Sequence, residues 1–244
     1  MTHDDTDWTI ELRLDDVLRG QGMDPEPVKA RSPRVVEAAE AAIEQGRGLL
    51  KPHVMTREYR VLRHEPDGLV LEGGEFRCGE GLAARIAGAE RLIVVGATVG
   101  DDLLDHAVEV AEDRGDPLLA LGMQGTGAAA VEDLAVQACR SISLPATEAG
   151  ERGVLCWPGS AVWPNVEAQR QIFALLRPDG EPGDADGGEA GLRLDEYGIV
   201  RPVTSVTFAV AVGAQTAADA PACGGAELPC ETCAKIPVCN FAGC

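Results

Sequence analysis

Aromatic residues and long apolar runs are both missing or scarce in this chain. Only 4% of its 244 residues are Phe, Trp or Tyr, and no apolar run reaches the roughly 20 residues of a transmembrane helix. Basic residues are few as well, because 21 Lys and Arg stand against 40 Asp and Glu and give a net charge of −19. Such a charge opposes binding to nucleic acid and to anionic membrane surfaces. We therefore expect no nucleic-acid partner and no membrane partner.

A secretory leader is not apparent at the N-terminus. Met1–Asp5 is polar and acidic, without the basic and apolar regions of a signal peptide. We expect a cytoplasmic protein.

Familiar catalytic motifs are absent too. All four His (His3, His53, His64 and His106) precede the Trp-rich segment described below, and Ser160 does not lie in a G-x-S-x-G elbow. The glycines from Gly96 to Gly100 follow an apolar run, but they match neither G-x-G-x-x-G nor G-K-[ST]. A nucleophilic enzyme and a nucleotide-phosphate site therefore receive little support.

The most distinctive segment that is present runs from Cys156 to Pro164. It holds two of the three Trp of the chain, together with Pro158, Gly159 and Pro164. Pro fixes φ and Gly permits positive φ, so the segment predicts a rigid, shaped loop, which a helix follows near Asn165. Two interpretations remain open: the Trp side chains fill the core, or they form a wall of a ligand site.

The rest of the chain predicts a mixture of strands and helices. Alternation predicts strands at 8–14 and 203–212, and apolar or β-rich runs predict further strands at 54–61, 68–71 and 92–95. Helices are predicted from Ser32-Pro33 to about Gly46, at 79–89, after Asp101, and from Asp116-Pro117 through Ser141, with glycines that interrupt or weaken the last one. The acidic, Pro- and Gly-rich segment 177–190 predicts a mobile surface loop.

Three motifs in order resemble the C-terminal activation domain of vitamin B12-dependent methionine synthase, and more closely its short stand-alone relatives. They are Pro-Gly-x-x-x-Trp-Pro at 158–164, Gly191–Gly198 followed by Pro202 and Ser205–Phe208, and Gly125–Glu132. The resemblance covers most of residues 8–213. It implies an α+β fold with a mixed or antiparallel sheet and helices, over a domain at 1–215.

The same resemblance implies a function and a set of ligand-binding residues. That domain binds S-adenosylmethionine (AdoMet) and presents its methyl group to a corrinoid cobalt while a reductase supplies an electron. The cofactor-binding residues implied here are Arg152, Trp157, Pro158, Gly159, Ser160, Trp163, Glu132, Glu196 and Ser205. The chain departs from the family's R-x-x-x-G-Y pattern, because Leu155 stands at the Arg position and Ser160 at the Tyr position.

Eight Cys occur in the chain, and five of them crowd into its last 22 residues. Cys230, Cys233, Cys239 and Cys244 offer four thiolates, with Cys223 as a fifth. Soft ligands at this spacing favour Zn or an iron–sulfur cluster, and reduced thiols without metal are the alternative. The sequence therefore predicts a Cys-rich metal-binding tail at 216–244.

These observations together favour AdoMet-dependent reductive reactivation of a separate corrinoid protein or cobalamin methyltransferase. A separate partner is expected because the chain has no D-x-H-x-x-G cobalamin motif. Two alternatives stay open: a non-catalytic accessory subunit that keeps only a docking surface, and an electron-transfer subunit that relies on the Cys tail.

Overall fold

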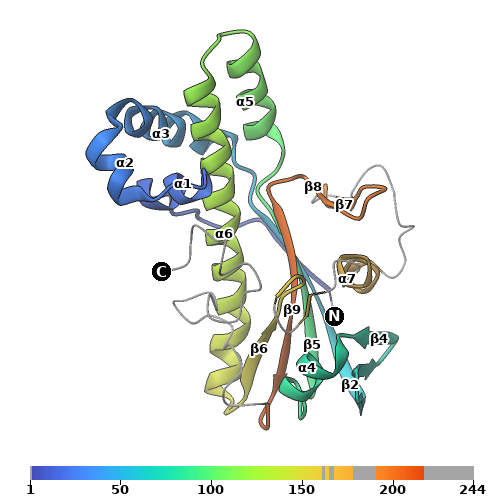
Figure 1. Cartoon of the computed structure of the whole chain (residues 1–244). Coiled ribbons are helices and arrows are strands. Elements are labelled where there is room, and N and C mark those ends of the chain that lie inside the picture. The colour runs from blue at the N-terminus through green and yellow to red at the C-terminus, as the bar shows by residue number, and fades with distance from the viewer. Residues whose placement is uncertain (1, 161–162, 165–167, 178–190, 217–244) are drawn as a thin grey trace.

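One antiparallel sheet forms the centre of the molecule in a computed structural model of the chain (Figure 1). The structure describes residues 2–160, 163–164, 168–177 and 191–216. The strand order is β4-β3-β2-β5-β9-β6, and β1 pairs with β2 beside this path. The strands of this sheet are β1 Thr2–Asp5, β2 His53–Glu65, β3 Gly68–Leu71, β4 Gly74–Arg77, β5 Arg91–Thr98, β6 Arg152–Cys156 and β9 Ser205–Gly213. A separate two-stranded hairpin consists of β7 Arg193–Leu194 and β8 Val200–Arg201.

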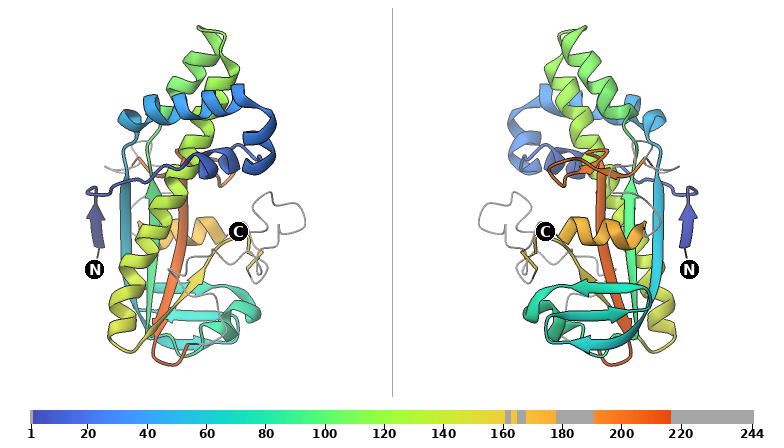
Figure 2. Two further views of the ribbon diagram at one scale, coloured as in Figure 1. Left: turned by 90° about the vertical axis from the view of Figure 1, so that its left-hand side faces the viewer. Right: turned by 90° about the vertical axis from the view of Figure 1, so that its right-hand side faces the viewer.

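Helices cover both faces of the sheet, as Figure 2 shows. The long helix α6 packs on one face, and the short helix α7 packs on the other. Helices α1, α3 and α5 pack against α6, whereas α2 packs against α1 and α3, and α4 packs against β3. The helices are α1 Leu14–Gly20, α2 Pro25–Arg31, α3 Pro33–Gly46, the 3-10 turn η1 Arg47–Leu49, α4 Gly79–Arg85, α5 Asp102–Glu112, α6 Pro117–Glu148 and α7 Ala168–Leu176.

Strand β9 separates the two cores because its side chains alternate between the two faces. Phe208, Val210 and Val212 are buried in the α6 core, whereas Ala209 and Ala211 are buried in the α7 core. This strand is therefore the part of the sheet through which the helical layer and the α7 side are connected.

The α+β fold with an antiparallel sheet, which the resemblance implied, is confirmed. One strand prediction is wrong. Residues 8–13 are extended, but they do not pair with a strand, and α1 begins at Leu14. Instead the Glu11 amide donates to Asp133, and Gln137 donates to the carbonyl of Thr9. The alternating pattern was real, because the segment buries every second side chain, but its partner is a helix.

Of the two effects predicted for the glycines after Asp116, interruption of the helix does not occur. Helix α6 is continuous over 32 residues, about 48 Å at 1.5 Å per residue. A Cβ on Gly125 would lie 2.5 Å from a carbonyl oxygen of α1, and one on Gly122 would lie 2.8 Å from a side chain of α3. The glycines therefore admit neighbouring helices, and the burial that results offsets their low helix propensity.

The predicted surface loop at 177–190 lies outside the described residues apart from Arg177, and the predicted metal-binding tail lies outside them from residue 217 onward.

Candidate functional site

A cleft opens between α7, the β7–β8 hairpin and the start of β9. Its volume is about 490 Å³, which falls in the range of small-molecule sites in proteins. It is lined by Gln169, Arg170, Tyr197, Gly198, Ile199, Val200, Val203 and Ser205. The cleft thus brings two residues of α7 together with residues 197–205, which form the hairpin and the start of β9, on the α7 side of the sheet.

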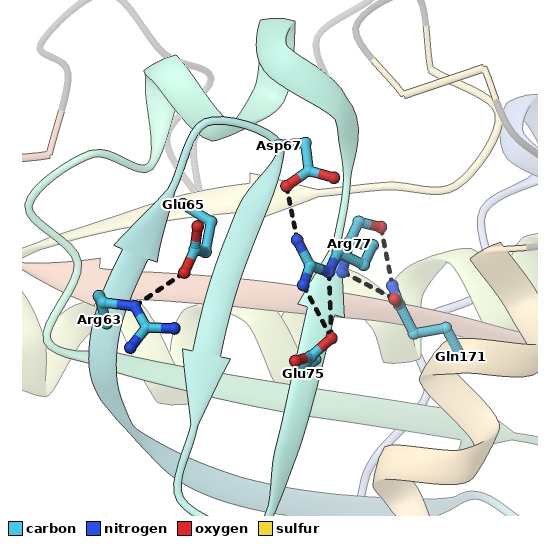
Figure 3. A network of polar contacts seen from close by, with 6 residues as sticks. All are labelled: Arg63, Glu65, Asp67, Glu75, Arg77 and Gln171. Atoms are coloured by element: carbon cyan, nitrogen blue, oxygen red, sulfur yellow. Dashed lines mark hydrogen bonds and ion pairs between the residues drawn. The ribbon is translucent and has the colours of Figure 1, made fainter.

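Helix α7 is held against the sheet by side chains at three points. The side-chain amide of Gln171 forms two hydrogen bonds with the backbone of Arg77 on β4 (Figure 3). Its oxygen accepts from the Arg77 N–H at 2.7 Å, and its NH₂ group donates to the Arg77 C=O at 3.0 Å. The Tyr59 hydroxyl of β2 donates to the carbonyl of Leu175, and the Thr207 hydroxyl of β9 donates to Gln169. The cleft residues on α7 are consequently fixed relative to the strands.

Charged side chains form ion pairs on the same group of strands (Figure 3). Arg77 bonds to Asp67 at 2.7 Å and to Glu75 at 2.9 Å, and Arg63 bonds to Glu65 at 2.7 Å. These pairs are largely exposed, so each contributes little to stability. Of these pairs, the one between Arg77 and Asp67 connects β4 to the turn between β2 and β3.

The β7–β8 hairpin is organised by Asp195. Its carboxylate accepts from the backbone N–H of Ile199 at 2.9 Å and of Tyr197 at 3.0 Å, and it binds the Arg201 guanidinium at 3.1 Å. The bond from Ile199, with those from Arg201 and Tyr197, lowers the pKa of Asp195. The hairpin is therefore shaped before any ligand arrives.

The rim of the cleft is apolar and unusually exposed. Tyr197 is 78% exposed, Ile199 51% and Val203 59%. Single exposed apolar side chains are ordinary, but a cluster of them around one cleft marks a binding surface. Beside them the Arg170 guanidinium lies against Gly198, 3.4 Å from a Cβ built there, and donates to the carbonyl of Glu196 at 3.1 Å.

A hydroxyl network forms the polar floor. Ser205 donates to Thr98 across β9 and β5 at 2.7 Å, and Thr98 also accepts from the N–H of Gly100 at 3.1 Å. His53 of β2 is paired with Thr98 in the sheet register, and its side chain is 7% exposed. Ser205 therefore connects the cleft to a buried hydroxyl group, that of Thr98, on the neighbouring strand.

The sequence-predicted site residues do not gather in one place. Glu196 and Ser205 are at the cleft, one in the hairpin and one on its floor. Arg152 pairs with Gly213 at the opposite end of β9, roughly 27 Å of strand from Ser205. An arginine at that position cannot reach a ligand bound at Ser205, so the implied set does not form a single site.

The two Trp of the Cys156–Pro164 segment lie on opposite faces of the sheet. Trp163 is 2% exposed and packs edge-on against Phe76 in the α7 core, with ring centroids 5.0 Å apart. Trp157 is partly buried on the α6 side and stacks on Phe208 at 5.7 Å. Both pack into the cores, and neither lines the cleft; their contact with a cofactor stays a prediction.

Between them the loop makes a tight turn. Pro158 is buried, Gly159 has φ +82°, and its N–H donates to the carbonyl of Trp163 at 2.8 Å. Within the described residues, the Ser160 hydroxyl is buried without a hydrogen-bond partner. The prediction that Pro158, Gly159 and Ser160 touch a cofactor stays a prediction.

Glu132 lies on the helical side, far from the cleft face. It is exposed on α6, where α1 removes part of its hydration. Desolvation and repulsion from Asp16 raise the pKa of Glu132, and the attraction of Arg19 opposes this rise only in part. Glu132 does not line the cleft, and its contact with a cofactor stays a prediction.

Sequence reasoning missed most of the cleft lining. Arg170, Tyr197, Ile199 and Val203 were not selected. The sequence offered one signal for these residues: Tyr197 and Ile199 are large apolar side chains in a turn around Gly198, and turns on the surface of soluble proteins normally carry polar side chains.

No metal centre and no membrane span is found among the described residues. They contain no group of three or more His, Cys, Asp or Glu side chains placed to hold a metal. The predicted ligands Cys223, Cys230, Cys233, Cys239 and Cys244 lie outside them. None of the described helices combines the length and apolar character that crossing a bilayer requires.

Comparison with known proteins places the fold. No protein-family model matches the sequence, and no curated protein matches it. The chain is similar to a solved structure, the MetH reactivation domain bound to AdoHcy, with a TM-score of 0.59 and 13% sequence identity. The match covers 90% of this chain and 81% of that one. At this identity the similarity establishes the architecture alone: the chain has the fold of the MetH reactivation domain.

Proposed function

We propose that this protein binds AdoMet in the cleft beside α7 and takes part in the reductive reactivation of a separate corrinoid protein. The observation that carries the proposal is the shared fold over 90% of the chain with a reactivation domain that binds AdoHcy. AdoHcy is the product that remains when AdoMet gives up its methyl group, so a domain that binds one accommodates most of the other.

The cleft residues fit such a ligand in size and in chemistry. A volume of about 490 Å³ suits a small molecule. Arg170 and Gln169 provide N–H donors, Ser205 provides a hydroxyl, and Tyr197 provides an aromatic face on the rim. When bound, AdoMet supplies the reactive methyl group. The part of the protein is to bind it, orient it and keep it on a face that a corrinoid partner can approach.

Isothermal titration calorimetry with AdoMet and with AdoHcy on the full chain tests the first half of the proposal. We expect saturable binding, and binding that is lost when Ser205 and Arg170 are both replaced by Ala. Absence of heat at millimolar ligand, confirmed by unchanged amide resonances in NMR spectra, would remove AdoMet from the function. The second half is tested by return of activity to an oxidised corrinoid methyltransferase supplied with an electron donor.

An accessory subunit without AdoMet is the second candidate, and two observations favour it. Leu155 is buried in the sheet where the family has Arg, and Ser160 replaces Tyr. The exposed apolar rim would then serve to dock a partner protein. Pull-down of a corrinoid protein by a chain that binds no AdoMet would favour this candidate.

The electron-transfer alternative depends on the five cysteines of the tail. Iron or zinc content and the visible spectrum of protein purified without oxygen test it. Absorbance near 400 nm, a rough guide for iron–sulfur clusters, together with iron and sulfide would favour this role. Zinc or no metal would exclude it.

A further inference from the structure

The three cysteines in the described part of the chain are in two different states. Cys78 and Cys156 are free and buried, whereas Cys139 on α6 takes part in a disulfide bond. Because Cys78 and Cys156 are free thiols, neither of them is the partner of Cys139. The other five cysteines of the chain all lie between residues 223 and 244, and they are the candidates that remain.

The surroundings of Cys139 favour a partner from the same chain. Cys139 is only 6% exposed, and it belongs to the α6 core together with Leu155 of β6 and Phe208 of β9. A sulfur with so little exposure leaves scant room for the folded surface of a second protein. A segment of the same chain has instead a high effective concentration at this position, because the chain itself connects the two cysteines.

The chain also leaves the sheet near the end of α6. The Thr216 hydroxyl lies 3.4 Å from the carbonyl oxygen of Arg152, where β6 begins, and α6 ends shortly before that at Glu148. Cys139 is nine residues back along α6, about 14 Å at 1.5 Å per residue. The seven residues from Thr216 to Cys223 span up to about 23 Å when extended. Every cysteine of the tail therefore has enough chain to reach Cys139.

We propose that Cys139 is the attachment site of the Cys-rich tail, held by a reversible disulfide bond to one of the five tail cysteines. The bond forms by thiol–disulfide exchange with a small disulfide such as glutathione disulfide. The Cys139 thiol and the tail thiol together give up two protons and two electrons, and the small disulfide leaves as two thiols. An excess of reduced glutathione reverses the exchange and releases the tail.

Such an attachment decides where the tail is held and how many of its thiols are available. Cys139 lies in the α6 core, on the face of the sheet opposite the cleft beside α7. The bond therefore fastens the tail on the helical side and away from the cleft. Of the five tail cysteines one is then bonded and four remain, the number of ligands that a tetrahedral Zn site takes. Reduction adds the fifth thiol to this set.

Peptide mapping of the full chain tests the bond, because trypsin separates the cysteines concerned. Cleavage after Lys and Arg, except before Pro, releases Cys139 in peptide 115–140 and the tail cysteines in peptides 194–235 and 236–244. The protein is first equilibrated with glutathione disulfide, and its free thiols are then blocked with N-ethylmaleimide in denaturant. We expect peptide 115–140 to be linked to one of the two tail peptides, and the link to disappear when the digest is reduced with dithiothreitol.

Two serine variants and a gel complete the test. Cys139→Ser should abolish the linked peptide and leave its former tail partner labelled by N-ethylmaleimide, which identifies that partner. Cys156→Ser, at a cysteine that is also buried, is the matched control and should keep the link. Maleimide on Cys139 of the unmodified chain, a link from Cys139 to Cys78 or Cys156, or a reducible dimer in electrophoresis would overturn the proposal. The mapping involves no AdoMet, so this inference and the proposed function stand or fall separately.

Discussion

Trp163 distinguishes the two interpretations of the Cys156–Pro164 segment. In one its ring is part of the core, and in the other it is a wall of a ligand site. Its ring is 2% exposed and meets Phe76 edge-on at 5.0 Å and 67°. Replacing a buried Trp by Ala costs about 3–5 kcal/mol, of which the aromatic pair accounts for about 0.5–1.5 kcal/mol. The total stability of a typical domain is only about 5–15 kcal/mol, so Trp163→Ala should remove a large share of it.

Thermal unfolding measures this loss. For a chain of this length each kcal/mol lowers Tm by about 2–4 °C, so Trp163→Ala should lower Tm by roughly 6–20 °C. Trp163→Phe keeps a ring against Phe76 and should lower Tm much less. Leu62→Ala, at a side chain 58% exposed on β2, is the control and should shift Tm little.

The ligand affinity of Trp163→Phe completes the test, because this variant stays folded. We expect its dissociation constant for AdoHcy to match that of the unmodified protein, since Trp163 does not line the cleft. A Trp163→Ala variant that keeps its Tm but loses AdoHcy would refute the reasoning. It would make the ring a wall of the ligand site instead of part of the core.

Three further predictions follow from packing and from pKa shifts. Gly125→Ala places a Cβ 2.5 Å from a backbone oxygen of α1 and should lower the free energy of unfolding, by about 1–3 kcal/mol in denaturant titration; Gly48→Ala meets nothing within 4 Å, and equal stabilities would contradict the helix-crossing argument. Burial raises the pKa of Cys78 to about 12 and also raises that of Cys156, so at pH 8 both thiols should escape iodoacetamide in native protein and react in denaturant, as peptide mass spectrometry can measure. Because the folded-state pKa of Asp195 is lowered, its contribution to hairpin stability is complete above the ordinary aspartate pKa of about 3.9 and is lost as pH falls through the lower folded value; amide protection factors in the hairpin, which divide out the intrinsic pH dependence of exchange, should fall only in that acidic range, and their loss already near pH 6 would argue against Asp195 as its organiser.

Local patterns predicted the strands β2, β3, β5 and β9 and the helices α3 to α7. They did not predict β1, β4, β6, β7 and β8, or the helices α1 and α2. The alternation from Val203 to Val212 predicted β9 and, with it, two different faces. The segment after Trp8 shows the limit of the same rule. Its alternation reports which side chains are buried, and burial against a helix gives the same pattern as burial in a sheet.

The candidate site could not be predicted because motifs that are close in sequence separate in space. Trp157 and Trp163 are six positions apart and enter opposite cores. Arg152 and Ser205 resemble parts of one family pattern. The antiparallel pairing of β6 with β9 nevertheless places Arg152 beside Gly213, at the opposite end of β9 from Ser205. The cleft depends instead on how α7 and the β7–β8 hairpin pack together, which no short-range pattern encodes.

The hydrogen bonds between Gln171 and the backbone of Arg77 also affect how molecules of this protein associate with one another. Strand β4 is the last strand on its side of the sheet, and an open edge strand is a template on which another chain can add a strand and begin to aggregate. The Gln171 amide occupies one N–H and one C=O of that edge, as a neighbouring strand would. A helix side chain thereby takes the place of a further strand, and the residue that steadies the cleft also helps to keep the sheet from growing.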